Sequence, residues 1–250
     1  SSKILLWLII RMFKIKKIKT VKFLTNNLIV LCVFVALFGC SKEVEQTPLT
    51  VYCNIINEKL YSFSRLSNFE KQKFDELKKS RFALYKDEFI EAAQTFDLEW
   101  ELLAAVAFQE SQWNPKARSA TQVKGMMMLT LPTAASVGVT NRLDPIQSIY
   151  GGAQYLSDLR TITEHGTSSG DRIAFILAAY NLGTTNVNNA IKNINKSSTQ
   201  ITWLDLEEHL INLETSMDTE SYSRGQQTVD FVERVRDYYY LLLSQNCSGN

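Results

Sequence analysis

The sequence has few of the residues that interrupt helices or bind metals. Its 250 residues include 4 Pro, 10 Gly, 4 Cys and 2 His. No stretch shows the sustained alternation of apolar and polar residues that marks a half-buried strand, so the sequence predicts no sheet. His165 and His209 stand in no C-x-x-C or H-x-x-x-H context, the kind of spacing on which zinc sites depend. We therefore expect neither a metal site nor a cofactor.

Acidic residues are missing from residues 1–40. That segment carries seven Lys or Arg and contains an apolar run at 28–38, which is shorter than the ~20 residues that span a bilayer. A basic region before a short apolar run predicts an export signal. The run closes on Leu37-Phe38-Gly39-Cys40-Ser41, which resembles a bacterial lipoprotein box and implies cleavage before Cys40 and acylation of that residue. The alternative is an uncleaved membrane anchor.

Both alternatives place the rest of the chain outside the cytoplasm, and we expect a lipid-anchored protein of the outer membrane that faces the periplasm. Without residues 1–40, 27 − 7 leaves 20 Lys and Arg against 26 Asp and Glu, a net charge of −6. An acidic domain lacks the basic patch that binds phosphate backbones. We therefore expect no nucleic-acid partner.

Two cysteines remain in the exported part of the chain, Cys53 and Cys247, close to its two ends. Two thiols in an oxidising compartment favour a disulfide. Because the two ends of a domain often lie close together, we expect these cysteines to be joined. The alternative is a pair of free thiols in mobile ends.

The hydrophobic pattern predicts one all-α domain at residues 69–250, preceded by a polar tether at residues 41–68. Apolar residues at a spacing of 3–4 predict helices at 82–96 and from 102, the second apolar almost all round and therefore buried. Asp144-Pro145 supplies an N-cap and a first-turn proline. Further helices are expected at 131–137, 144–162, 171–182, 187–194, 203–212 and 224–243.

Glu110 is the main catalytic candidate. It lies in the last turn of the buried helix, because Asn114-Pro115 disfavours helix at Asn114. Desolvation there would keep its carboxyl group protonated and able to act as a general acid. The alternative is a surface charge, although a glutamate at a helix C-terminus faces an unfavourable dipole. No clear second carboxylate flanks it, since Asp144 looks like a cap and Glu101 is nine residues away.

Three motifs follow one another along the chain: Phe108-Gln109-Glu110-Ser111-Gln112-Trp113-Asn114-Pro115, Gly125-Met126-Met127-Met128-Leu129-Thr130 and Ala178-Ala179-Tyr180-Asn181-Leu182-Gly183. Together with Gly151-Gly152-Ala153-Gln154-Tyr155-Leu156, they resemble the catalytic domain of lytic transglycosylases related to goose-type lysozyme, in particular the membrane-bound lytic murein transglycosylase F type. The resemblance covers about residues 85–242 and implies an all-α, lysozyme-like fold of the transglycosylase SLT type. F-type proteins also carry a solute-binding-like domain, to which nothing here corresponds.

The resemblance assigns roles to individual residues. It makes Glu110 the acid/base and Ser119 a contact to the scissile-bond region, while Gly125 to Leu129, with Met127 and Met128, would form a wall of the substrate cleft. Tyr180 and Asn181 would face Glu110, and Tyr222, in Tyr222-Ser223-Arg224-Gly225, would cover the sugar site. Core packing is the alternative for Tyr180 and the default for the methionines. Trp113 is expected to support Glu110 from behind.

The resemblance also implies a reaction. The substrate would be the glycan strands of peptidoglycan, cut at the β-1,4 bond between N-acetylmuramic acid and N-acetylglucosamine with formation of a 1,6-anhydro end. One carboxyl group would act first as acid and then as base. The alternatives are a hydrolytic muramidase of the goose-type lysozyme kind and a non-catalytic lipoprotein that binds peptidoglycan.

Overall fold

The computed structural model describes residues 48–215 and 222–247, and all regular elements in these ranges are helices. Two isolated β-bridges, Arg118 with Lys124 and Lys124 with Leu129, lie in the loop at residues 112–130. The α-helices are α2 (Pro48–Phe63), α3 (Asn68–Ser80), α4 (Lys86–Thr95), α5 (Trp100–Ser111), α6 (Leu131–Ser136), α7 (Pro145–Asp158), α8 (Ser169–Leu182), α9 (Thr184–Asn193), α10 (Trp203–Thr215) and α11 (Tyr222–Leu243).

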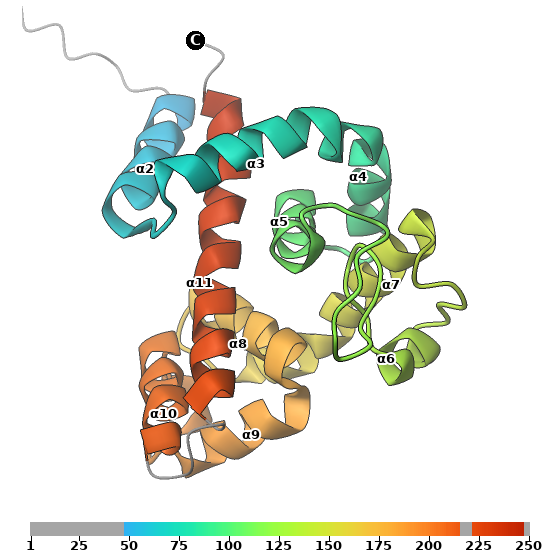
Figure 1. The fold of residues 1–250 in the computed structure, drawn as a ribbon. Helices are drawn as coiled ribbons and strands as arrows, with labels where there is room; N and C mark the ends of the chain where they lie inside the picture. The colour runs from blue at the N-terminus through green and yellow to red at the C-terminus, as the bar shows by residue number, and fades with distance from the viewer. Residues whose placement is uncertain (1–47, 216–221, 248–250) are drawn as a thin grey trace, which may run out of the picture. The chain divides into compact units, whose positions relative to one another are not determined.

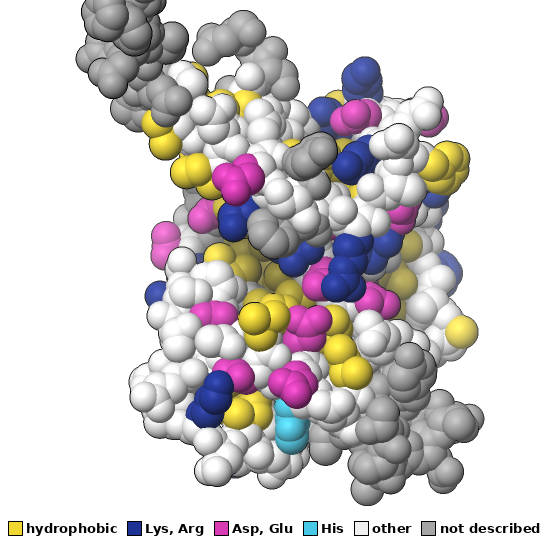
Figure 2. Space-filling model, turned by 90° about the vertical axis from the view of Figure 1, so that its left-hand side faces the viewer, with side chains coloured by type: hydrophobic (Ala, Val, Ile, Leu, Met, Phe, Trp, Pro, Cys, Tyr) yellow, Lys and Arg dark blue, Asp and Glu magenta, His cyan; other side chains and the backbone are white. Residues whose placement is uncertain are grey.

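Helix α5 forms the centre of the helical unit. Six consecutive residues, from Leu103 to Phe108, are buried, which an α-helix achieves only when neighbours surround it. The long helix α11 packs along α5 and also against α8 and α10, and α4 and α7 cover other sides of α5 (Figure 1). On the face that carries α2 and α10, hydrophobic side chains lie among acidic and basic ones (Figure 2).

Several helices begin at the side-chain caps that their sequences encode. Asp144 accepts a hydrogen bond of 2.9 Å from the Gln147 backbone, directly before Pro145, as predicted. Ser67 and Glu70 form a capping box at the start of α3. Such caps satisfy backbone N–H groups that have no partner within the helix. The helix expected at 144–162 changes to a 3₁₀ turn at Leu159, and the one expected at 82–96 is divided at Tyr85.

The N-terminal boundary differs from the prediction. Residues 48–63, placed in the predicted tether, form α2, and the helical unit begins at Leu49 rather than at residue 69. Unlike its polar flanks, this segment is largely apolar, and its helix carries Ile56, which is buried. Residues 1–47, with the predicted signal and Cys40, lie outside the described residues.

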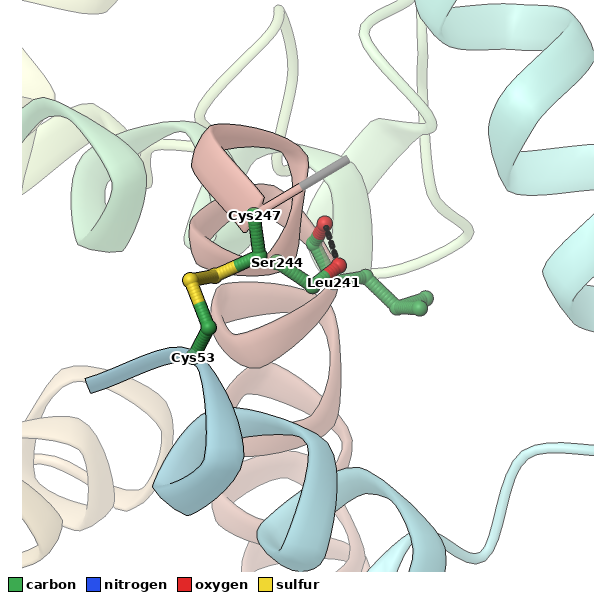
Figure 3. Close-up of a disulfide and its surroundings, with 4 residues drawn as sticks. All are labelled: Cys53, Leu241, Ser244 and Cys247. Carbon is green, nitrogen blue, oxygen red and sulfur yellow. Dashed lines mark hydrogen bonds between the residues drawn. A yellow bond between two sulfur atoms is a disulfide. The ribbon is translucent and has the colours of Figure 1, made fainter. Parts of the chain in front are cut away.

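The structure contains the disulfide that the positions of Cys53 and Cys247 predict (Figure 3). It joins α2 to the 3₁₀ turn Ser244–Cys247 after α11, with a Cα–Cα distance of 5.4 Å and a sequence separation of 194 residues. The Ser244 hydroxyl donates a hydrogen bond of 2.9 Å to the Leu241 carbonyl and so continues α11 into this turn (Figure 3). The two ends of the helical unit are therefore covalently linked.

The described residues offer neither a membrane span nor a metal site. None of their helices is long and apolar enough to cross a membrane. They also contain no group of three or more His, Cys, Asp or Glu placed to hold a metal ion.

Candidate active site

A cleft of about 220 Å³ opens where the C-terminal ends of α5 and α8 meet the loop at 112–130. It contains Glu110 at its α5 side and Tyr180 and Asn181 at its α8 side. Among the described residues that line it, Glu110 is the one carboxylic acid. The other lining residues are Thr121, Val123, Met128, Leu129, Thr130, Thr133 and Tyr155.

The end of α5 fixes the position of Glu110. The helix ends at Ser111, and Gln112 adopts a left-handed conformation with φ 54° while its N–H bonds the Phe108 carbonyl at 2.7 Å. Trp113 is left-handed as well, with φ 55°. Two consecutive non-glycine residues in this region are costly, so the surrounding structure must hold the turn.

Trp113 provides much of that hold. Its side chain is fully buried, and its indole N–H donates a hydrogen bond of 2.9 Å back to the Ala104 carbonyl of α5. The ring lies 4.6 Å from Phe108 and 4.9 Å from Phe82, measured between centroids. Trp113 thus anchors the turn after Glu110 from inside the core and does not line the cleft, in agreement with its expected supporting role.

Ser111 ties the same turn to the cleft wall. Its hydroxyl lies 2.7 Å from the Met126 carbonyl and 3.1 Å from the Ala107 carbonyl, and it accepts a hydrogen bond of 3.2 Å from the Asn114 backbone. One small side chain therefore connects α5 with both ends of the loop that carries the cleft wall.

Gly125 is required by this loop for steric reasons. Its φ is +88°, and a Cβ atom placed on it would stand 1.7 Å from the Arg142 carbonyl oxygen. Any larger residue would push the loop away from the segment before α7. Gly125 is not among the residues that line the cleft. It shapes the cleft wall that was expected at Gly125 to Leu129, and a direct contact of Gly125 with substrate stays a prediction.

The methionine triplet divides between core and cleft. Met126 and Met127 are fully buried, and the Met127 side chain fills the space beside Gly152, where a Cβ atom would come within 2.6 Å of it. Met128, with φ 46°, lines the cleft. The buried Met127 side chain joins the loop to α7, which agrees with packing as the default role of the methionines, and a contact of Met127 with substrate stays a prediction. Met128 keeps the predicted location.

Tyr180 and Asn181 are held by hydrogen bonds to other elements. The Tyr180 hydroxyl donates to the Met127 carbonyl at 2.7 Å, and its ring stacks on Phe231 of α11 with an interplanar angle of 5°. The Asn181 side-chain oxygen accepts a hydrogen bond of 2.9 Å from Thr228. The α8 side of the cleft is thus fixed both to the loop wall and to α11.

The environment of Glu110 favours its protonated form. Burial raises the pKa of its carboxyl group from the ordinary 4.5 to about 8. Burial, and then the negative charge of an ionised Glu110, raise the pKa of the Tyr180 phenol as well. Near neutral pH the cleft therefore presents a protonated carboxyl group beside a neutral phenol, an arrangement suited to proton donation.

Ser119 and Tyr222 are not placed in the cleft by the structure. The Ser119 hydroxyl lies 2.9 Å from the Thr121 hydroxyl and accepts a hydrogen bond of 3.3 Å from the Val123 backbone. It organises the turn from which Thr121 and Val123 reach the cleft. Tyr222 begins α11, but its side chain lies outside the described residues. Contacts of Ser119 and Tyr222 with substrate remain predictions.

Four polar lining residues were not predicted as site residues: Thr121, Thr130, Thr133 and Tyr155. Tyr155 had a usable signal, since it stands in the Gly151–Leu156 motif and its ring lies 5.3 Å from that of Tyr180. Thr130 caps α6 by accepting a hydrogen bond from the Thr133 backbone, which gives it a structural reason to be there. Nothing in the sequence distinguished Thr121 from an ordinary loop residue.

A second cavity, of about 290 Å³, lies near the opposite ends of α5 and α8. Its lining is mainly apolar and aromatic, with Trp203 and Tyr239 among its residues. The carboxylates there already have partners: Glu233 pairs with Arg65, and Asp171 accepts a hydrogen bond of 2.7 Å from the Trp203 backbone. The first cleft is therefore the better candidate for acid–base chemistry.

An all-helical unit with a protonated glutamate at the end of its central helix, facing a tyrosine across a cleft, defines a lysozyme-like domain. Residues 87–202 match the family model described as "Transglycosylase SLT domain". The lytic transglycosylase Slt of Pseudomonas aeruginosa, solved as an inactive mutant, shares the fold with a TM-score of 0.51 at 18% identity, over 83% of this chain and 31% of that one. The predicted fold class and family resemblance are confirmed.

Two relatives share more sequence with the chain. A protein of Shewanella loihica named "Membrane-bound lytic murein transglycosylase F" is 41% identical over 198 residues, which is 75% of this chain and 40% of that protein. A protein of the same name from Shewanella sediminis is 40% identical over the same length, with the same shares. The chain thus spans less than half the length of these curated relatives.

Proposed function

We propose that the protein is a lytic transglycosylase that cuts the glycan strands of peptidoglycan. The observation that carries this proposal is Glu110, the single carboxyl group among the described residues of the cleft, with a pKa raised to about 8. The names of the two Shewanella relatives support the same substrate class, since murein is peptidoglycan. No cofactor is needed for the chemistry that we propose.

In the first step, Glu110 donates its proton to the oxygen of the β-1,4 bond between N-acetylmuramic acid and N-acetylglucosamine. The bond from the muramyl C1 to that oxygen breaks, and N-acetylglucosamine leaves with the proton. A carboxyl group that is protonated at neutral pH suits this role. The acetamido oxygen of the muramyl residue stabilises the positive centre at C1, which replaces the second carboxylate of most glycosidases.

In the second step, the Glu110 carboxylate takes the proton from the muramyl 6-hydroxyl, and the resulting oxygen bonds to C1. This closes the 1,6-anhydro ring and returns Glu110 to its protonated form, so no water is consumed. The neutral Tyr180 phenol, with its proton engaged by the Met127 carbonyl, can offer an oxygen lone pair toward the positive centre. Ser119 and Tyr222 are assigned to substrate contact by family resemblance alone.

We also propose that the protein is exported and attached to a membrane by a lipid on Cys40, facing the periplasm from the outer membrane. The support is the basic and apolar pattern of residues 1–40 and the box that ends at Cys40. The name of the relatives, membrane-bound, is consistent with it. The Cys53–Cys247 disulfide also fits an oxidising compartment.

Mass spectrometry of the products from purified sacculi tests the proposed activity. We expect muropeptides that end in 1,6-anhydro-N-acetylmuramic acid, lighter by one water molecule than the products of hydrolysis. Hydrated reducing ends would instead indicate a muramidase, and binding without any released product would indicate a non-catalytic protein.

Asp218 and Glu220 provide a test of the single-carboxylate mechanism, because they precede α11 and lie outside the described residues. We expect the Asp218→Asn and Glu220→Gln variants to form the same anhydro product at rates close to that of the parent protein. Loss of activity in one of them, with the fold intact, would identify a second catalytic carboxylate and contradict the mechanism.

A further inference from the structure

The start of α2 carries an exposed apolar patch. Val51, Tyr52 and Ile55 are 41%, 37% and 50% exposed, and Leu49 beside them is 46% exposed. At 100° per residue, Val51, Tyr52 and Ile55 lie within about 100° of the helix circumference, so they share one side of α2. We call these three residues the α2 patch. Hydrophobic side chains appear at the upper edge of Figure 2, the end of that face at which α2 lies.

Val51 and Ile55 lie away from the side by which α2 joins the unit. Ile56, which is buried, and Cys53 are turned toward the domain, and both lie about 100° or more from Val51 and Ile55. Tyr52 lies about 40° from Ile56, and burial and the charges of Glu101 and Glu99 raise its pKa, so it borders the side that faces the domain. Apart from the disulfide, α2 packs little against the other described helices. Val51 and Ile55 are therefore exposed on the outer side of α2.

The chain before α2 indicates what covers the exposed residues of α2. The apolar run at 28–38 and the lipid proposed at Cys40 belong to a membrane, and Pro48 is the eighth residue after Cys40. Eight extended residues span at most about 29 Å, so the anchor keeps the start of α2 within that distance of the bilayer. At such a short distance the effective concentration of lipid is high, and even a small apolar patch becomes occupied.

We propose that the α2 patch inserts into the interfacial layer of the membrane that holds the lipid anchor. Val51 and Ile55 enter the acyl boundary, and Tyr52 remains at the headgroup level, where an aromatic ring with a hydroxyl group is favoured. Because the disulfide joins α2 to the end of α11, insertion fixes the orientation of the whole helical unit at the membrane surface. The proposal depends on the membrane attachment at Cys40 or through the apolar run, and not on the catalytic activity.

Quenching of tryptophan fluorescence by brominated lipids tests this contact. The full chain, isolated from membranes with its anchor, is reconstituted in phosphatidylethanolamine and phosphatidylglycerol vesicles that contain brominated acyl chains. Ile55→Trp places a reporter in the patch. Asn57→Trp places one at an exposed position about 160° around the helix from Ile55 and 120° from Val51, and serves as the matched control. The quenching of each is measured above that of the parent protein.

We expect the Ile55→Trp reporter to be quenched at least about twofold more than the Asn57→Trp reporter, because only the patch faces the acyl boundary. Val51→Trp should behave like Ile55→Trp, which would show that the result does not depend on one substitution. Equal quenching at positions 57 and 55 would overturn the oriented contact. Blue-shifted emission at position 55 without quenching would show that a protein surface, such as a second copy, covers the patch.

Flotation of the vesicles separates the possible failures. If the protein does not float with them, both the anchor and the membrane contact of α2 are overturned. If it floats but the patch reporter is not quenched, the contact alone is overturned. Cleavage of sacculi by the same preparations reports the proposed activity independently, since no variant in this set touches the cleft.

Discussion

The phenolic hydroxyl of Tyr180 donates its hydrogen bond to the main-chain carbonyl of Met127, at 2.7 Å and across 53 residues of sequence. This contact joins the end of α8 to the buried part of the cleft wall. It commits the phenolic proton, so the Tyr180 oxygen can face the cleft as an acceptor. The position of the phenol and the shape of the wall therefore depend on each other.

Replacement of Tyr180 by Phe should affect both stability and activity. The Met127 carbonyl would lose its partner in a buried location, at a cost of about 1–3 kcal/mol in the free energy of unfolding. We expect kcat/KM for sacculus cleavage to fall ~10-fold or more, because small displacements of a positioned group are costly in rate. Urea denaturation and muropeptide release measure the two effects. Tyr240→Phe, at a half-buried position on α11 outside the cleft, is the control and should change neither.

Glu110→Gln should abolish cleavage while the fold persists. The amide has the shape of the carboxyl group but cannot cycle a proton, and general acid–base catalysis contributes at least ~100-fold. Glu101→Gln, on the first turn of the same helix, should retain activity. The measurement is anhydro-muropeptide release by chromatography, with circular dichroism as the check on folding. A folded Gln variant that keeps most of its activity would contradict the assignment.

The raised pKa of Glu110 predicts a dependence of stability on pH. Between its ordinary pKa of 4.5, expected in the unfolded chain, and about 8 in the folded protein, the folded state binds more protons, so the free energy of unfolding falls as pH rises through this window. Each pKa unit corresponds to about 1.4 kcal/mol before allowance for solvent screening. Glu110→Gln removes this dependence. The difference in the free energy of unfolding between the Glu110→Gln variant and the parent should therefore shift in favour of the variant from pH 5 to pH 9. Urea titrations at both pH values measure this difference.

The same pKa shift predicts that kcat/KM of the parent protein declines above about pH 8, where Glu110 loses the proton that it must donate. Constant activity from pH 7 to pH 10 would contradict a protonated Glu110 as the starting form.

Two glycines with similar backbone conformations allow a test of the cleft wall. Gly125 has φ +88° and the Arg142 carbonyl where a Cβ would stand, whereas Gly138 has φ +72° and nothing within 4 Å. Gly138→Ala should cost about 1 kcal/mol, the price of a left-handed alanine. Gly125→Ala should cost several times more and eliminate activity, because the wall must move. Thermal unfolding compares the two, and equal losses would show that the contact with Arg142 can relax.

Removal of the disulfide should release α2 before the rest of the unit unfolds. α2 packs little against the other described helices, so the Cys53→Ser, Cys247→Ser double variant should be cut by protease within residues 48–63 under native conditions. The chain-entropy model gives about 5 kcal/mol for a loop of 194 residues, an upper expectation for the loss of global stability. Limited proteolysis with mass spectrometry, together with calorimetry, separates the local effect from the global one.

The sequence was sufficient to predict those features that depend on local pattern. The buried helix that ends at Glu110 follows from its continuous apolar residues and from Asn114-Pro115, and the cap at Asp144 follows from its neighbouring proline. The cysteine positions predict their pairing because few alternatives remain. The all-α fold class follows from the same periodicity.

The details of the cleft wall could not be predicted in this way. Whether Met127 or Met128 reaches the cleft depends on the left-handed backbone of Met128 and on the space beside Gly152, neither of which leaves a periodic signal. Helix α2 is a different case. The tether expected at 41–68 combined polar flanks with residues 48–63, which are largely apolar, so a local signal for this helix was present in the sequence.

The link between Cys53 and Cys247 closes residues 53–247 into a covalent ring. A protease that cuts once anywhere between these residues leaves both fragments joined, and the cleft remains attached to residues 1–47. A cut before Cys53 has the opposite result, because it frees the entire ring in one piece. The segment ahead of Cys53 is therefore where a single cleavage would separate the cleft from residues 1–47.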